Sequence, residues 1–255
     1  MCYDIKASLE AQLKRAKRYN NVAAILEIEQ KLIPFTDLPM HHKSGFSHPK
    51  GLIYPNLTPN YPMLAHWGLV PHWVKDKQTQ QKIWNNTINA RSETMFTKPS
   101  FRDSAKNRRC LVFVDGFYEH HHFNGKTYPF YIHATNNQPL CLAGLWSEWI
   151  DTQTGEVLAS FSVLTTKGNS MMAKIHNNPK LKEARMPVIL EEENEDLWLS
   201  GIANSQEEQN RLLSLCQPAS PSHLQAYTVT RLRGLAYPGN IPEINKPVNY
   251  PELVY

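Results

Sequence analysis

The chain has 255 residues, of which 41% are hydrophobic and 20% are charged, and its formal net charge is +4. These values describe an ordinary globular protein of one large domain or two small ones. No apolar run approaches the roughly 18 residues that span a bilayer, and the N-terminus lacks the apolar core of a signal peptide, which excludes a membrane-spanning chain. The sequence therefore predicts a cytoplasmic protein with no membrane partner. The mild positive charge permits a nucleic-acid partner without requiring one.

Helices are expected in the first part of the chain. Apolar residues recur at helical spacing over residues 5–33, and Asn20-Asn21 marks a break between two helices. The same segment carries a basic cluster, which is interpreted as a solvated helix face. The cluster comprises Lys14, Arg15, Lys17 and Arg18. Over residues 34–71, frequent Pro, His and Asn indicate irregular structure with short strands.

Strands dominate the second half of the chain, where β-branched and aromatic residues are frequent. The expected strands cover residues 110–114, 128–133, 139–149, 158–166, 185–190 and 224–230, and the expected helices cover 191–199 and 206–215. Asn124-Gly125 is a hairpin signal. Strands joined by hairpins, with helices at the ends, predict a single α+β domain over residues 1–255, in which antiparallel sheets form a distorted, barrel-like core. Residues 234–255 form a Pro-rich tail.

Of the four cysteines, only one lacks a structural explanation. They are Cys2, Cys110, Cys141 and Cys216, with no CxxC pair and no zinc-ligand spacing. Cys110 and Cys141 lie in apolar strand patterns and are expected to be buried. If Met1 is removed, Cys2 carries a free α-amine beside its thiol. Such a β-aminothiol condenses with aldehydes.

Short polar stretches elsewhere supply the other groups that this condensation requires. TINARSET at 87–94 contains Asn89, GFYE at 116–119 ends in Glu119, and KIHNN at 174–178 contains His176. An α-amine titrates near about 8 and a thiol near about 8.5, so both are partly nucleophilic at cellular pH. The amine gives an imine, and the thiolate then closes a thiazolidine ring. A carboxylic acid and an imidazole can transfer the protons, and an asparagine can accept a hydrogen bond from the amine.

Each of these residues also has a purely structural explanation. Asn89 is typical of a turn or cap. Glu119 ends a strand, where a carboxylate usually faces solvent, and His176 precedes a loop signature and is expected on the surface. Arg91 can pair with Glu93. Taken singly, the structural interpretations are favoured, whereas the set as a whole favours the chemical one.

The set of motifs resembles the SRAP family (SOS-response-associated peptidase). The matching stretches follow one order along nearly the whole chain: MC at 1–2, HWGLVPHW at 66–73, NARSET at 89–94, RRCL at 108–111, GFYE at 116–119, AGLWSEW at 143–149, IH at 175–176 and RMPVIL at 185–190. The resemblance implies a single SRAP domain, a monomer, that senses abasic sites in single-stranded DNA without a metal or organic cofactor. The family name implies a peptidase activity, interpreted as release of Met1.

By this resemblance four residues have catalytic roles. Cys2 is the nucleophile that forms a thiazolidine crosslink with the opened sugar and so shields the lesion. Asn89 positions the amine and the sugar. Glu119 assists ring opening and imine formation, and His176 transfers a proton at the sugar oxygen, including during reversal.

Basic and aromatic side chains around this pocket are expected to contact the DNA. Arg91 is the main phosphate candidate, because a guanidinium binds phosphate through two hydrogen bonds. Trp67 is expected to stack beside the lesion, with a core position as the alternative, and Trp73 is expected in the core. Lys98 and Arg102 are further phosphate candidates.

The chain departs from the family beside the nucleophile. Most members read MCGR, whereas Tyr3 and Asp4 stand here. Asp4 is expected to repel a phosphate, so Lys6 is a candidate for the lost contact. His120 replaces the tryptophan that usually follows FYE. The segment over residues 5–33 is interpreted as a subgroup feature.

Three other functions remain open at this point. An N-terminal-nucleophile amidohydrolase would use Cys2 to form an acyl-enzyme on a small amide. A metal site would draw on Glu119 and nearby histidines, although neighbouring strand residues point to opposite faces and only alternate ones can share an ion. The histidines are His41, His42, His120, His121 and His122. A non-catalytic DNA-binding module would leave Cys2 incidental.

Overall fold

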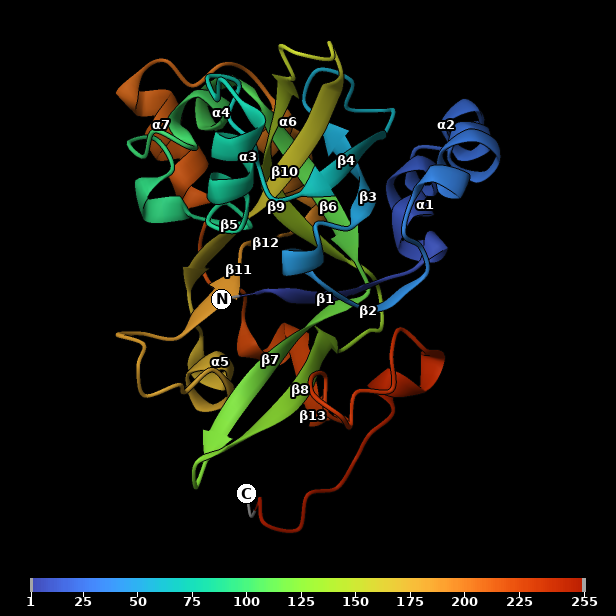
Figure 1. Cartoon of the computed structure of the whole chain (residues 1–255), viewed down its shortest axis with the longest axis vertical. Coiled ribbons are helices and arrows are strands. Elements are labelled where there is room, and N and C mark those ends of the chain that lie inside the picture. Colours follow the sequence, from blue (N-terminus) through green and yellow to red (C-terminus); the bar gives the residue numbers. More distant parts are fainter. Residues whose placement is uncertain (1, 254–255) are drawn as a thin grey trace.

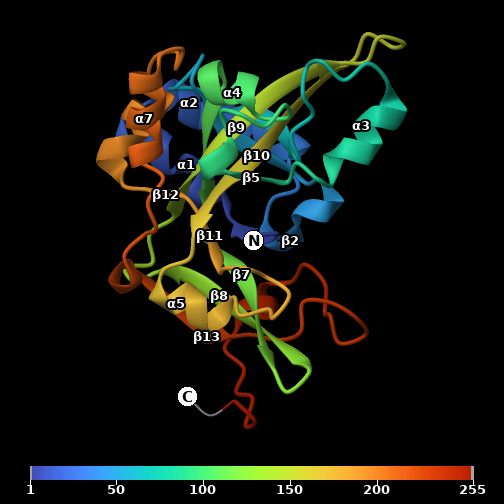
Figure 2. The same cartoon turned by 90° about the vertical axis from the view of Figure 1, so that its left-hand side faces the viewer.

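A computed structural model describes residues 2–253 of the chain, and two views of it show a closed barrel above a smaller open sheet (Figures 1 and 2). Met1, whose removal the sequence predicts, lies outside the described residues, as do residues 254–255. No helix within residues 2–253 is long and apolar enough to cross a membrane.

The upper sheet closes on itself to form the barrel. Its strands follow the order β11-β10-β4-β3-β6-β9-β12, and β9 also pairs with β10, which closes the ring. The strands are β3 (Lys50–Pro55), β4 (Met63–Trp67), β5 (Asn89–Arg91), β6 (Arg109–Val114), β9 (Leu140–Ile150), β10 (Val157–Lys167), β11 (Arg185–Pro187) and β12 (Ile189–Leu190). β10 pairs with β4 and with β5 in parallel, and the other pairs are antiparallel. The predicted α+β class with a barrel-like core is confirmed.

The lower sheet is open and antiparallel. Its order is β13-β8-β7-β1-β2. The strands are β1 (Asp4–Ala7), β2 (Met40–Ser44), β7 (Gly116–Phe123), β8 (Lys126–Ala134) and β13 (Leu224–Thr228). Asn124 and Gly125 join β7 to β8 with φ of 47° and 73°, which confirms the hairpin prediction, since a tight hairpin turn requires positive φ at both positions.

The α-helices lie mainly around the barrel, with α1, α2 and α7 on one side and α3 on the other (Figure 2). They are α1 (Leu9–Arg18), α2 (Val22–Leu26), α3 (Lys77–Trp84), α4 (Arg102–Asn107), α5 (Ser170–Ile175), α6 (Glu195–Leu199) and α7 (Gln206–Ser214). Asn20 has a φ of 49° and Asn21 caps α2, which confirms the predicted break. α5 lies apart from the others, against the lower sheet (Figure 1).

Two predictions for the N-terminal segment are wrong. Residues 5–7 belong to strand β1 rather than a helix, because β7 and β2 supply hydrogen-bonding partners on both of its sides. Ser8 then begins α1 by accepting a hydrogen bond from the Ala11 amide. Arg15 of the basic cluster is 2% exposed rather than solvated, since it packs against α6. Cys110 and Cys141 are buried as predicted.

Candidate active site

The N-terminal end of β1 brings Cys2 to the place where the lower sheet meets the barrel (Figure 1). β1 is flanked by β7 and β2, which fixes its direction. Cys2 is fully buried, and its carbonyl accepts a hydrogen bond from Asn89 Nδ2 at 2.7 Å. Two residues that are far apart in the sequence are therefore in direct contact.

Asn89 is held rigidly but keeps one unused acceptor. It begins β5, which pairs in parallel with β10, so the turn or cap interpretation is wrong. Its Oδ1 atom is buried and has no hydrogen-bond partner among residues 2–253. Buried polar atoms nearly always have a partner. A carbonyl oxygen beside Cys2 is thus available to accept a hydrogen bond.

Glu119 and His176 face each other in the same buried region. Glu119 is 5% exposed and His176 is 6% exposed, so the predicted surface positions of both are wrong. His176 Nε2 lies 3.9 Å from Glu119 Oε2. Burial raises the pKa of Glu119 to about 7 and lowers the pKa of His176 to about 4. At neutral pH the carboxyl group exchanges its proton readily and the imidazole is neutral.

Arg185 sets the orientation of His176. Its backbone N–H lies 3.0 Å and its carbonyl oxygen 3.1 Å from His176 Nδ1, which fixes the ring with Nε2 on the side of Glu119. Its side chain is buried and binds both carboxylate oxygens of Glu93, at 2.6 and 2.9 Å. Glu93 follows the strand that carries Asn89, so Arg185 connects the two motifs. The predicted Arg91–Glu93 pair is replaced by this one.

The Cys2 thiol is held in its protonated form. Burial raises its pKa well above the ordinary value, and the negative charge of Glu119 raises it further. Protonation of Glu119 removes that second effect. The reactivity of the thiol is therefore coupled to the protonation state of the neighbouring carboxyl group.

A cavity of about 410 Å³ opens beside this group. Its walls include Tyr3, Asp4, Glu119, His176, Arg231 and Arg233. The Tyr3 ring lies 5.0 Å from that of Phe46, which is 47% exposed. The cavity therefore joins the buried polar groups to solvent along a wall with aromatic side chains.

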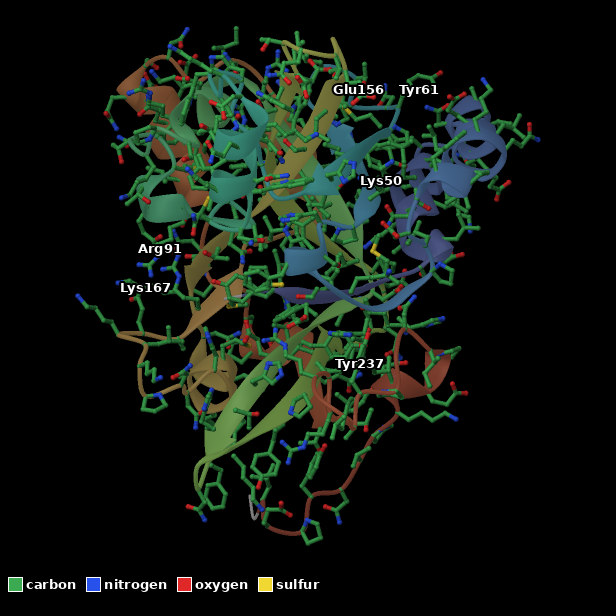
Figure 3. The ribbon with its side chains drawn as sticks, in the orientation of Figure 1. Lys50, Tyr61, Arg91, Glu156, Lys167 and Tyr237 are labelled. Atoms are coloured by element: carbon green, nitrogen blue, oxygen red, sulfur yellow. The ribbon has the colours of Figure 1, made fainter. Side chains whose placement is uncertain are left out.

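Only some of the residues that were predicted to contact DNA lie near this site. Arg91 is exposed, and Figure 3 shows it near Lys167 where the barrel meets the lower sheet. Lys167 was not predicted, and it lies two residues beyond the Thr165–Arg91 pair of β10 and β5. Lys98 and Arg102 are exposed but do not line the cavity, and Arg102 begins α4 at the far end of the barrel (Figure 1).

Three further expectations are wrong. Trp67 is fully buried and donates to the Ile88 carbonyl at 2.9 Å, so it cannot stack on a base. Trp73 is 42% exposed rather than in the core. Lys6 lies over the Tyr131 ring at 5.7 Å and does not line the cavity.

The histidines beside Glu119, all of them among the described residues, do not form a metal-binding cluster with it. His120 and His122 line the cavity together with Glu119 and His176, whereas His121 Nδ1 lies 2.9 Å from the Lys174 carbonyl. Within the described part of the chain no three His, Cys, Asp or Glu side chains are arranged to hold a metal ion. The metal-site alternative has no support from this geometry.

Comparisons with known proteins agree with one another. Residues 34–233 match the family described as SOS response associated peptidase (SRAP). The chain is 37% identical over 190 residues to the abasic site processing protein YoqW of Bacillus subtilis, covering 74% of this chain and 73% of that one. It is 31% identical over 157 residues to the abasic site processing protein HMCES of Gallus gallus, covering 54% and 44%. A crystal structure of a protein from Bacteroides thetaiotaomicron superposes with a TM-score of 0.81 at 30% identity, covering 97% of this chain and 100% of that one.

Proposed function

The chain belongs to the SOS response associated peptidase (SRAP) family, and from this premise we propose that it processes abasic sites in single-stranded DNA by forming a covalent bond through Cys2. The observation that carries the proposal is the contact of Cys2 with Asn89, whose Oδ1 atom lacks a partner among residues 2–253. The names of the relatives given above support the choice of lesion.

The proposed reaction has three steps whose atoms balance. Hydrolysis of the Met1–Cys2 peptide bond consumes one water and releases methionine. The α-amine of Cys2 then attacks C1 of the ring-opened sugar, and loss of one water gives an imine. Finally the thiol adds across the imine, with sulfur bonding to C1 and the proton passing to nitrogen. The product is the protein plus the DNA strand minus one water.

The buried polar residues have separate roles in these steps. Asn89 Oδ1 accepts a hydrogen bond from the new α-amine and orients its lone pair toward the sugar. Glu119, with a pKa of about 7, gives a proton to the sugar ring oxygen as the ring opens and takes one back as the imine forms. In the tautomer that carries its proton on Nε2, His176 donates a hydrogen bond to the departing oxygen at the same place. The rise in the Cys2 pKa keeps the thiol protonated until the imine is in place.

Exposed side chains around the cavity hold the strand. Arg91, with Lys167 beside it, contacts a phosphate on the barrel side. Tyr3 and Phe46 take the stacking role that the sequence suggested for Trp67, because Tyr3 lines the cavity and the exposed Phe46 ring lies 5.0 Å from the Tyr3 ring.

Intact mass spectrometry tests the proposal. The purified protein is measured before and after incubation with a single-stranded DNA that carries one abasic site. We expect loss of Met1, then a mass gain equal to the strand minus one water. Cys2→Ala and Cys2→Ser should give no stable adduct, since only sulfur closes the ring readily.

Two outcomes contradict the proposal. A mature N-terminus that gives no adduct would overturn it and leave hydrolysis of small amides as the reaction to assay. If Met1 is retained, a protein whose Cys2 is exposed by cleavage of an N-terminal fusion is used instead. Absence of an adduct from that protein would overturn the covalent chemistry as well.

A further inference from the structure

We propose that Arg231 and Arg233 form a binding site for a backbone phosphate of single-stranded DNA on the wall of the cavity beside Glu119. The inference rests on the proposed function, because it takes the DNA strand to enter the cavity that contains Glu119 and His176. Both arginines line that cavity. They come from the segment after β13, far from every motif that suggested DNA binding.

Arg233 is fixed in place by Asp4. Asp4 is 2% exposed, and its Oδ2 atom accepts a hydrogen bond from Arg233 Nη2 at 3.0 Å, whereas its Oδ1 atom lies 3.2 Å from His42 Nε2. Burial opposes ionisation of Asp4, but the His42 hydrogen bond and the Arg233 charge outweigh it and lower the pKa. The Asp4 carboxylate is therefore paired with an arginine, which offsets the repulsion expected between Asp4 and a phosphate.

Arg233 keeps most of its binding capacity. Its side chain is 59% exposed although it contacts a buried carboxylate. A guanidinium has five N–H donors in a planar fork, and Nη2 is the atom that binds Asp4. The remaining donors can serve a phosphate, and because Asp4 already restricts the side chain, binding costs less conformational entropy than for a free surface arginine.

Arg231 supplies a second fixed guanidinium. Its group donates to the Thr127 carbonyl and lies over the rings of Tyr128 and Tyr250, at 5.4 and 5.8 Å. Glu252, which accepts a hydrogen bond from the Tyr128 hydroxyl at 2.9 Å, lies near enough for its charge to interact with that of Arg231. A cation held by aromatic rings and a carbonyl, beside a second arginine on the same cavity wall, is suited to an anionic ligand.

The charges around the cavity favour a phosphate at this side. Asp4 offsets Arg233, Glu252 offsets part of the Arg231 charge, and Glu119 is partly protonated at neutral pH. The loop that brings Asn178 and Leu181 to the wall also carries the exposed Lys180 and Lys182. A strand held by Arg91 and by the two arginines of the cavity wall would have its lesion at Glu119.

The test is noncovalent binding to short single-stranded DNA in which a tetrahydrofuran replaces the abasic sugar, so that no crosslink can form. Affinity is measured by fluorescence anisotropy over a range of KCl concentrations. Arg233→Gln and Arg231→Gln should each weaken binding about two- to fivefold. Each should also lower the slope of log affinity against log salt by about 0.7, as loss of one phosphate contact requires. Arg233→Lys should keep the slope.

Arg211→Gln is the matched control, because Arg211 is an exposed arginine of α7, on the barrel and away from the cavity. If either cavity variant fails to fold by circular dichroism, the parent protein is titrated with strands in which one phosphate at a time is a neutral methylphosphonate. One position should then reproduce the loss of affinity and slope. Slopes equal to that of Arg211→Gln, or no sensitive phosphate, would overturn this site while an adduct on abasic DNA still upheld the proposed function. Lower slopes for the two cavity variants, together with no adduct on abasic DNA, would support this phosphate site and overturn the proposed function.

Discussion

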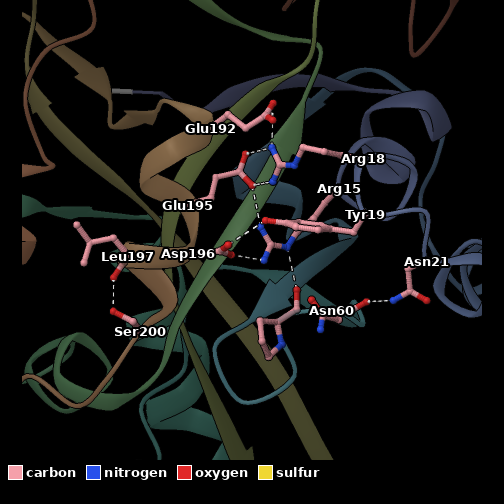
Figure 4. Close-up of polar contacts among 11 residues, drawn as sticks. Arg15, Arg18, Tyr19, Asn21, Asn60, Glu192, Glu195, Asp196, Leu197 and Ser200 are labelled. Carbon is pink, nitrogen blue, oxygen red and sulfur yellow. Dashed lines mark hydrogen bonds and ion pairs between the residues drawn. The ribbon is translucent and has the colours of Figure 1, made fainter.

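Two groups of polar residues in this molecule, each built around buried side chains, differ in how burial affects their ionisation. In the first, Arg15 and Arg18 of α1 bind Glu195 and Asp196 of α6 (Figure 4). The pKa of Arg15 is raised and that of Asp196 is lowered, because hydrogen bonds between opposite charges outweigh burial where it opposes them. In the second group, burial raises the pKa of Glu119 and lowers that of His176.

This difference distinguishes residues that stabilise the fold from residues that are suited to proton transfer. The first group has every charge matched and holds α1, and with it the end of β1, on the barrel. The second group pushes an acid and a base toward their neutral forms, which is the condition for proton transfer near neutral pH and costs stability. A substitution should therefore lower stability in the first group and preserve or raise it in the second.

The largest effect is expected for Glu195→Gln. Glu195 is 1% exposed and is bound by both arginines, so its loss leaves Arg15 buried with only one carboxylate partner. Removing one partner of a buried ion pair costs about 3–5 kcal/mol. Urea unfolding should detect this loss as a lower midpoint at unchanged slope.

The control for Glu195→Gln is Glu27→Gln, which removes a pair with the 70% exposed Lys31. An exposed pair of this spacing contributes about 0.5 kcal/mol or less. Equal losses from the two variants would show that the Arg15–Glu195 network has no special structural role.

Glu119→Gln should raise the free energy of unfolding, whereas Glu195→Gln lowers it. The carboxyl pKa rises from 4.5 to about 7 on folding, so the folded protein holds a proton that the unfolded chain has lost between these pH values. Stability contributed by Glu119 is therefore lost as the pH rises through that window, by about 3 kcal/mol above pH 7. The variant should be more stable than the parent at pH 8 and nearly equal near pH 4.5.

The same variant should react slowly, because removing a general acid or base costs about 100-fold or more. Unfolding at both pH values and the rate of adduct formation provide the measurements. A variant that is less stable at pH 8 than at pH 5, relative to the parent, would contradict the assignment of Glu119 as a destabilising buried acid.

The strands and the site could be predicted from the sequence to different extents. Alternating and aromatic runs located β6, β8, β9 and β10, and Asn124-Gly125 located the hairpin, because these signals are local. β1 was missed because its residues continue an apolar pattern that also fits a helix, and only pairing with β7 and β2 decides between them.

Burial of single polar residues could not be predicted. His176 precedes a loop signature, yet it is covered because the Arg185 backbone binds its ring across the loop. Arg15 lies in a basic cluster, and its partner Glu195 is 180 residues away in the sequence. Motif recognition located Cys2, but the local pattern gave no sign that Asp4 would hold an arginine rather than repel a phosphate.

The smallest change in stability is expected for Asn89→Leu. Asn89 contacts Cys2 in the same site as Glu119 and His176, so this variant tests whether a third polar residue there also serves the reaction rather than the fold. The variant loses the hydrogen bond to the Cys2 carbonyl, about 1 kcal/mol, but also removes a buried oxygen that has no partner among residues 2–253. The two terms nearly cancel, so the melting temperature should stay close to that of the parent. Adduct formation should fall sharply, because nothing then orients the amine.

Asn89→Asp sharpens this prediction, because it keeps an acceptor for the amine while replacing the donor to the Cys2 carbonyl. It should lose more stability than Asn89→Leu, since a carboxylate oxygen then faces a carbonyl, but it should retain more activity after Met1 is removed. The opposite ranking, with Asn89→Leu unstable and still reactive, would mean that Asn89 supports the fold of β5 and has no role in the reaction. The melting temperature and the rate of adduct formation of the two variants, measured together, decide between these roles.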